Sequence, residues 1–246
     1  MVQTPGVPLP TVPWGVGMIV KVMFCWLLAY FSTAYIGVPA SLMMLGLERE
    51  ELGVRGQALL DLGVDIAQLG STLLILYLCL RQFRPRDRGL FPFKWRGWWP
   101  LAVVVGFLSF PVVTWFGQQS LVWFPEEAGA VTTHLENSMF LGDWVTNVAY
   151  AAVVAVLAPV WEELLFRGFL VSSLLRFLPP WGAVLTSSLV FAMCHFRVQT
   201  VLPLTILGVV FGTVFLRCRN LLPAMVLHGS WNVSVLIALY LGQNYW

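Results

Sequence analysis

The sequence is poor in charged residues. Of its 246 residues only 11% are Asp, Glu, Lys or Arg, against about 25% in an ordinary soluble domain, and 59% are hydrophobic. The mean hydropathy is +0.80. No basic stripe with interleaved aromatics occurs outside one short loop, which argues against a nucleic-acid partner. This scarcity of charge indicates an integral membrane protein.

Signals for disulfides, secretion and lipidation are also missing. The first fourteen residues hold no Lys or Arg, so they lack the charged start of a secretory signal and are expected to form a short cytoplasmic tail. The final QNYW is no lipidation signal, so the chain is not expected to be a prenylated substrate itself. No CxxC pair occurs, and we expect free, buried thiols at Cys25, Cys79, Cys194 and Cys218.

What the sequence has in abundance is long apolar runs. Stretches of about 20 such residues span a bilayer as helices. Seven candidates occur, at 17–46, 57–82, 97–124, 147–176, 181–198, 199–217 and 221–242. Proline removes a helical hydrogen bond, so kinks are expected at Pro39 and Pro111. We therefore predict an all-α, polytopic membrane bundle of about seven to eight transmembrane helices.

The few charges in the loops predict the orientation of these helices. Cytoplasmic loops of membrane proteins carry an excess of Lys and Arg. The loop after the second stretch holds Arg81, Arg84, Arg86, Arg88, Lys94 and Arg96, whereas the loop at 125–143 holds only Glu126, Glu127, Glu136 and Asp143. The loop at 218–220 is again basic. The pattern predicts a cytoplasmic N-terminus, with nearby tryptophan and phenylalanine rings at headgroup depth.

One polar face lies in the second stretch. Asp61, Asp65 and Gln68 recur at i, i+4 and i+7 and so share one side of a helix. Such a face lines the mouth of a water-filled cavity or packs against neighbouring helices. The sequence leaves both interpretations open.

Two adjacent carboxylates, Glu162 and Glu163, lie within the apolar run AVLAPVWEELLFRGFL. A charge at membrane depth costs roughly 2.5–3.5 kcal/mol even on the mildest insertion scale, so such residues usually mark a functional site. Arg167 follows Glu163 by four positions and lies on the same helical face, where the two can pair. Glu162 points about 100° away. We therefore assign the ion pair to Glu163 and Arg167 and regard Glu162 as the chemically available carboxylate.

Two of the three histidines, His195 and His228, fall within later apolar stretches, whereas His134 lies in the acidic loop. Phe191 precedes His195 by four residues, so its ring shares a face with the imidazole. His228 and Asn232 are also four apart. A carboxylate, two imidazoles and an amide from three spans can activate water and stabilise an oxyanion.

These residues form the patterns EExxxR, FxxxH and HxxxN, in that order. The chain here resembles the CPBP family of intramembrane proteases, also called the ABI family, which includes type II CAAX prenyl endopeptidases and bacteriocin-processing or self-immunity proteins. The resemblance implies that residues 146–246 form the catalytic core helices. It also implies that residues 1–145 are transmembrane helices of the variable part.

The resemblance further implies hydrolysis of a peptide bond within the membrane. By analogy, Glu162 and His195 activate a water molecule, while His228 and Asn232 stabilise the oxyanion. The alternative is a divalent metal such as zinc on Glu162, His195 and His228, with a fourth position open to water. We favour metal-free water activation, because Arg167 beside a dication is electrostatically unfavourable. No HExxH or Gly-x-Ser-x-Gly motif occurs.

The function predicted from these observations is an endopeptidase acting on a membrane-associated or prenylated, CAAX-type protein in the lipid bilayer. One alternative is a non-catalytic scaffold or chaperone that retains the polar core. Another is a small-solute transporter, since buried acids and histidines also build proton relays. Transporters usually contain two related halves, and the two halves of this chain share no repeated pattern.

Overall fold

In a computed structural model of the protein, residues 11–95, 97–125 and 144–241 are described, and every regular element in them is helical. In chain order these are α1 (Val16–Ser32), η1 (Thr33–Gly37), α2 (Val38–Leu45), η2 (Arg49–Glu51), α3 (Val54–Leu80), η3 (Arg81–Phe83), α4 (Trp99–Phe107), α5 (Phe110–Trp123), α7 (Trp144–Ala152), η4 (Val153–Leu157), α8 (Ala158–Glu163), η5 (Leu164–Val171), α9 (Ser172–Leu174), α10 (Pro180–Met193), α11 (Val198–Cys218) and α12 (Leu221–Tyr240). The acidic loop with His134, and Arg96 of the basic loop, lie outside the described residues. The expected helical bundle is confirmed.

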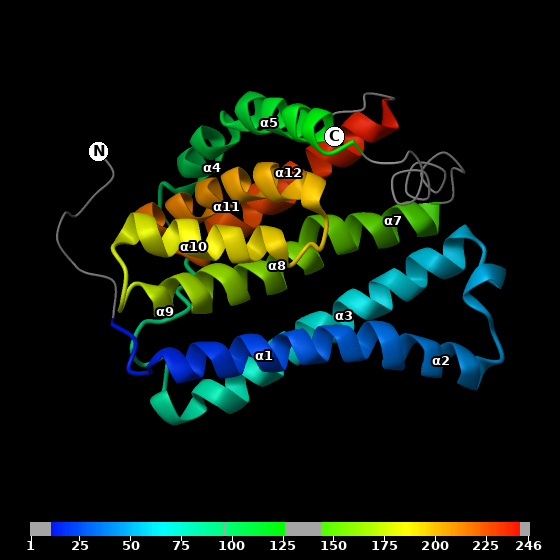
Figure 1. Cartoon of the computed structure of the whole chain (residues 1–246), viewed down its shortest axis with the longest axis horizontal. Helices are drawn as coiled ribbons and strands as arrows, with labels where there is room; N and C mark the ends of the chain where they lie inside the picture. The colour runs from blue at the N-terminus through cyan, green and yellow to red at the C-terminus, as the bar shows by residue number, and fades with distance from the viewer. Residues whose placement is uncertain (1–10, 96, 126–143, 242–246) are drawn as a thin grey trace.

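Six continuous helical segments are long and apolar enough to cross a bilayer: Val16–Leu45, Val54–Phe83, Trp99–Trp123, Trp144–Leu174, Val198–Cys218 and Leu221–Ala238. We number them spans 1 to 6. They lie roughly side by side along the longest dimension of the molecule (Figure 1). In a helix the backbone N–H and C=O groups bond to one another, and this is required because hydrocarbon offers them no hydrogen-bond partner. The chain is therefore a multi-pass membrane protein.

The stretch expected to span at 181–198 forms a shorter helix. Helix α10 has 14 residues, or about 21 Å at 1.5 Å per residue, against about 30 Å of hydrocarbon. It turns back directly into α11, and the turn lies about midway along the bundle (Figure 1). The tight packing of this hairpin depends on glycine, because a Cβ at Gly208 would lie 2.8 Å from the Cβ of Ser188. The hairpin thus places residue 195 inside the bundle's length.

The interruptions expected at prolines are present. Pro39 is the second residue of α2, which follows the π-helical segment η1 directly, and Pro111 is the second residue of α5, after a break between α4 and α5. A third interruption was not predicted: the π segment η4 ends at Leu157, and Pro159 is the second residue of the helix α8 that follows. In each case the proline lacks the N–H that a regular helix requires.

The two basic loops meet at one end of the bundle. Asn220 accepts a hydrogen bond from Lys94 N at 2.9 Å and donates one to Lys94 O at 2.7 Å, and Leu221 N donates to Pro92 O. This agrees with the alternation of charge from which the topology was predicted. The assignment of that end to the cytoplasm remains a prediction.

Candidate active site

The centre of the site is an ion pair within span 4. Arg167 donates from NH1 to Glu163 Oε1 at 2.7 Å and from NH2 to the carbonyl oxygen of Gly208 at 3.1 Å. Both side chains are buried, at 1% and 0% exposure. The guanidinium carbon lies 4.8 Å from the ring centre of Phe191 and 5.2 Å from that of Phe211. The pair expected from the spacing is present, and two helices of the hairpin enclose it.

His228 of α12 joins this pair to the second glutamate. Its Nδ1 lies 3.0 Å from Glu163 Oε1, and its Nε2 lies 3.7 Å from Glu162 Oε2. The ring stacks on Phe211 with centroids 4.7 Å apart. If the Nδ1 proton is donated to Glu163, Nε2 faces Glu162. A carboxylate that orients an imidazole in this way fixes which ring nitrogen is presented to a reactant.

The two glutamates have different environments. Glu163 Oε1 is shared by Arg167 and His228, whereas Glu162 Oε2 is buried and has no hydrogen-bond partner among the described residues. Glu163 Oε2 also lacks a partner, but that carboxylate is already bound by a cation. An unsatisfied buried oxygen is costly and needs an explanation. Glu162 Oε2 is therefore an acceptor that no group among the described residues occupies.

His195 lies at the tip of the α10–α11 hairpin. Its Nδ1 is 2.9 Å from the carbonyl oxygen of Phe191, and the two rings meet edge to face at 4.8 Å. A carbonyl only accepts hydrogen bonds, so Nδ1 carries the proton and Nε2 is the nitrogen left for chemistry. The same Phe191 ring lies 6.0 Å from His228. One phenyl group therefore contacts Arg167 and both imidazoles.

Asn232 contacts span 4 one turn further along α12. Its Nδ2 donates to the carbonyl oxygen of Val154 at 3.0 Å. Val154 lies in the π segment η4, where the i+5 donor for this carbonyl would be residue 159, a proline without an N–H. Asn232 thus satisfies a carbonyl that the helix itself leaves free.

The polar face of α3 packs against span 4 beside the site. Trp161 Nε1 donates to Asp65 Oδ1 at 3.1 Å, and Gln68 is only 3% exposed. Of the two interpretations left open for this face, packing between helices therefore holds for these two residues. Asp65 thereby fixes the residue that precedes Glu162.

Several contacts of the site were missed from sequence. Phe211 and the Gly208 carbonyl, both on α11, enclose Arg167 although neither belongs to the three motifs. The pair Gly208 and Gly212 was the available signal, because small residues four apart allow helices in membranes to approach closely. Gly212 does pack against Val184 of α10.

The alternative of a metal can be tested against these donors. Glu162 and the Nε2 atoms of His195 and His228 are chemically suitable ligands for zinc. However, no group of three or more His, Cys, Asp or Glu among the described residues is arranged to hold a metal ion. We therefore derive no step through a metal.

Comparison with known proteins agrees with the three motifs. The family model described as type II CAAX prenyl endopeptidase Rce1-like matches residues 144–234, a segment that contains every candidate site residue. The UPF0177 protein YbdI of Lactococcus lactis subsp. lactis is 29% identical over 102 residues, which are 40% of this chain and 51% of that protein. The chain thus spans about half the length of this curated relative. No solved structure matches it.

The fold and the site define a polytopic membrane protein with a buried glutamate, arginine and histidine cluster. Through residues 144–234, the chain matches the model of the Rce1-like family, type II CAAX prenyl endopeptidases, as the order of the motifs predicted.

Proposed function

We propose that this protein is an intramembrane endopeptidase that hydrolyses a peptide bond of a membrane-associated or prenylated protein with water activated by Glu162. The observation that carries the proposal is the buried, unpartnered Oε2 of Glu162, 3.7 Å from His228 Nε2. A water oxygen can lie about 2.8 Å from both atoms at once. The match to a family of prenyl endopeptidases supports the same chemistry.

In the proposed reaction, Glu162 accepts one proton from water while the water oxygen adds to the carbonyl carbon of the scissile bond. The carbon–nitrogen bond then breaks, and the leaving nitrogen takes the proton from Glu162. Atoms and charge balance without a further reactant. Glu163 is unsuited to this role because Arg167 and His228 already occupy its Oε1.

The two histidines and Asn232 divide the remaining tasks. His195, with Nδ1 fixed on Phe191, presents Nε2 as a second acceptor for the water. His228, when both ring nitrogens are protonated, donates from Nε2 to the developing oxyanion. We assign Asn232 a positioning role, because its amide joins α12 to the Val154 carbonyl and so fixes the helix that carries His228.

The experiment is a cleavage assay with the purified full chain, using a prenylated C-terminal peptide and its unprenylated counterpart in water enriched in oxygen-18. Mass spectrometry should find one labelled oxygen in the new carboxylate. Glu162→Gln, His195→Ala and His228→Ala should each lower the rate about 10²–10⁴-fold, the range for loss of acid–base catalysis. Ser230→Ala, a neighbour of His228 with no assigned role, is the matched control. Parallel reactions with a chelator test metal use.

Wild-type rates in the Glu162→Gln variant would contradict the proposal. So would cleavage by none of the proteins, which would favour the scaffold. Thermal melting of each variant shows that a loss of rate is not a loss of fold.

A further inference from the structure

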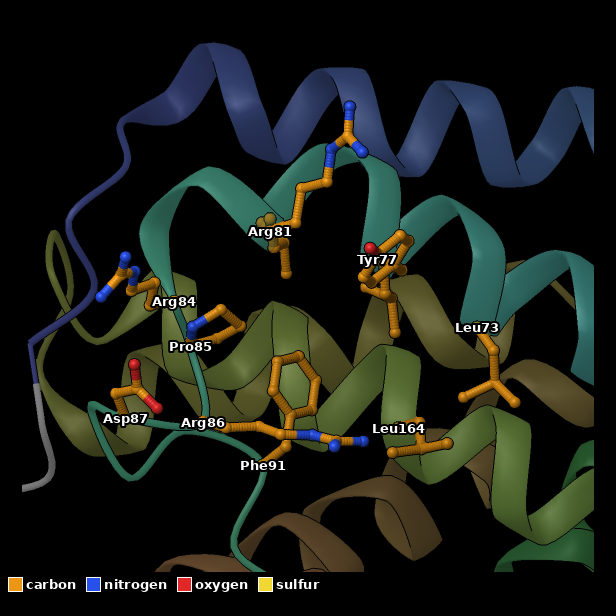
Figure 2. A pocket seen from close by; sticks show the side chains of 11 residues that line it. Leu73, Tyr77, Arg81, Arg84, Pro85, Arg86, Asp87, Phe91 and Leu164 are labelled. Carbon is orange, nitrogen blue, oxygen red and sulfur yellow. The ribbon is translucent and has the colours of Figure 1, made fainter.

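A second feature of the molecule lies where the basic loop meets α3 and span 4, and neither glutamate is part of it. A pocket of about 510 Å³ forms where α3 ends and the basic loop turns toward α4. Its walls come from the last turns of α3, from residues 81–91 and from Leu164 of η5 (Figure 2). None of the residues to which we assign chemistry lines it.

The polar side of the pocket is cationic. Arg81, Arg84 and Arg86 line it together with a single carboxylate, that of Asp87. Within the described ranges 11–95, 97–125 and 144–241, none of these arginines takes part in an ion pair. Arg88, which lies outside the pocket, instead donates Nε to the carbonyl of Phe83 and holds the turn. Arg81 does lie over the Tyr77 ring, at 5.9 Å from its centre, but this contact leaves its charge unneutralised, so all three guanidinium groups can pair with an anion.

The other side of the pocket is apolar. Leu73, Leu76 and Leu80 follow one another along α3, and Leu164 faces them from span 4. From Leu73 to Leu80 the helix rises about 10 Å, enough to lie along the first part of an acyl chain. Leu80 is 1% exposed whereas Leu73 is 48% exposed, so this wall runs from the protein interior to its lipid-facing surface.

The loop that closes the pocket adopts an unusual backbone conformation. Arg84 and Phe91 have φ of 48° and 58°, in the left-handed region that residues other than glycine seldom occupy. Such conformations persist where surrounding contacts enforce them and gather at ligand sites. Here the Phe91 ring rests on Gly168 of η5, since a Cβ at Gly168 would lie 2.7 Å from Phe91 Cδ1. The cationic wall is thus fixed to the helix of the candidate active site.

We propose that this pocket binds an anionic phospholipid. Its phosphate pairs with Arg81, Arg84 and Arg86, and one acyl chain lies along the leucines of α3. Arginine pairs with phosphate through two parallel hydrogen bonds, and basic pockets at the ends of membrane helices recognise anionic headgroups. A neutral lipid would leave the arginines unpaired, and a small soluble anion would leave the apolar wall uncovered.

The test measures lipid binding by the purified full chain with native mass spectrometry and thermal melting. The probes are phosphatidylglycerol, phosphatidylcholine of the same acyl chains, and inorganic phosphate. Phosphatidylglycerol should remain bound and raise the melting temperature, whereas the other two should not. The double variant Arg84→Gln/Arg86→Gln should bind phosphatidylglycerol at least tenfold more weakly.

The matched control is Arg217→Gln, which removes an exposed cation at the same end of the bundle but outside the pocket. It should bind phosphatidylglycerol as the wild type does. The double variant should melt at the wild-type temperature without added lipid, which separates lost binding from lost folding. Equal binding of phosphatidylcholine, an equal shift with inorganic phosphate, or full binding by the double variant would each overturn the proposal.

Discussion

Spans 1 to 3 and spans 4 to 6 have nearly the same apolar composition but very different degrees of burial. In the most apolar windows of the first three, 17%, 22% and 22% of residues are buried, against 39%, 39% and 61% in the last three. The second group also contains the buried ions Glu162, Glu163 and Arg167. Hydropathy alone therefore identifies membrane helices but does not distinguish those that face lipid from those that build a site.

The difference in burial between the two groups of spans follows from the polar groups that each must provide with hydrogen-bond or ion-pair partners. In spans 4 to 6, an arginine, two glutamates and a free carbonyl all need partners, and each unmet partner in a low-dielectric interior is expensive. The Gly208 carbonyl of α11 and the His228 and Asn232 side chains of α12 supply partners, which requires close packing. Spans 1 to 3 contact this group through apolar side chains, such as Trp26 against Trp161 and Phe166, and Val113 in a cluster with Leu207 and Leu227. Spans 1 and 2 flank this group on one side, and span 3 flanks it on the other (Figure 1).

The largest expected difference between the groups concerns their cations. Arg167→Ala should lower the free energy of unfolding by about 3–5 kcal/mol, because it leaves the carboxylate of Glu163 buried and unpaired. Lys21→Ala in α1, where the side chain is exposed, should change it by less than about 0.5 kcal/mol. Reversible unfolding in detergent measures both. Equal shifts would mean that the ion pair contributes nothing particular to the second group.

Glycine substitutions give a comparison of intermediate size. A Cβ at Gly229 would overlap the backbone carbonyl oxygen of Ala155, which cannot rotate away. Gly229→Ala should therefore destabilise the protein by about 1–3 kcal/mol, the usual range for overpacking. A Cβ at Gly70 of α3 meets nothing within 4 Å, so Gly70→Ala should leave the melting temperature unchanged or raise it. A lower melting temperature for Gly70→Ala would remove the contrast in packing.

The smallest predicted effect concerns the contact between the two groups. Trp161→Phe keeps an aromatic ring but removes the donor to Asp65, which should lower the free energy of unfolding by about 1 kcal/mol. Trp123→Phe in α5, where the side chain is 59% exposed, serves as the control. Thermal melting of both variants tests the contact. If the control loses as much stability as Trp161→Phe, the hydrogen bond to Asp65 does not join the groups.

Much of the fold could be predicted because hydrophobicity and proline act locally. Runs of about 20 apolar residues predicted the long helices, and missing N–H groups predicted the breaks at Pro39 and Pro111. The length of α10 could not be predicted, because the apolar residues that follow it continue into α11 through a turn. The π segment η4 could not be predicted either. Pro159 is evident in the sequence, but the donor to the Val154 carbonyl of this segment is Asn232, which lies on another helix.

As with the fold, the contacts of the candidate site could be predicted where they join residues close together in the sequence. Glu163 and Arg167 are neighbours in one continuous helical segment, and His195 follows directly on the end of the helix that carries Phe191, so a spacing of four was sufficient to pair them. The contacts of His228 with both glutamates join residues 65 or 66 positions apart in the chain, and no local period encodes them. Phe211 and Gly208 belong to none of the motifs and became part of the site only through the α10–α11 hairpin.

The sequence by itself determined that this protein lies in a membrane, that two glutamates and an arginine lie within one apolar run, and that the motif residues match one family. These properties depend on composition and on the spacing of three or four residues that places side chains on one face of a helix, and both can be read from short segments of the sequence. The tertiary structure decided which glutamate shares an oxygen with Arg167 and His228, and which one stays 3.7 Å from the nearest imidazole nitrogen. That choice depends on where His228, Arg167 and the hairpin meet, and only helix packing sets such distances.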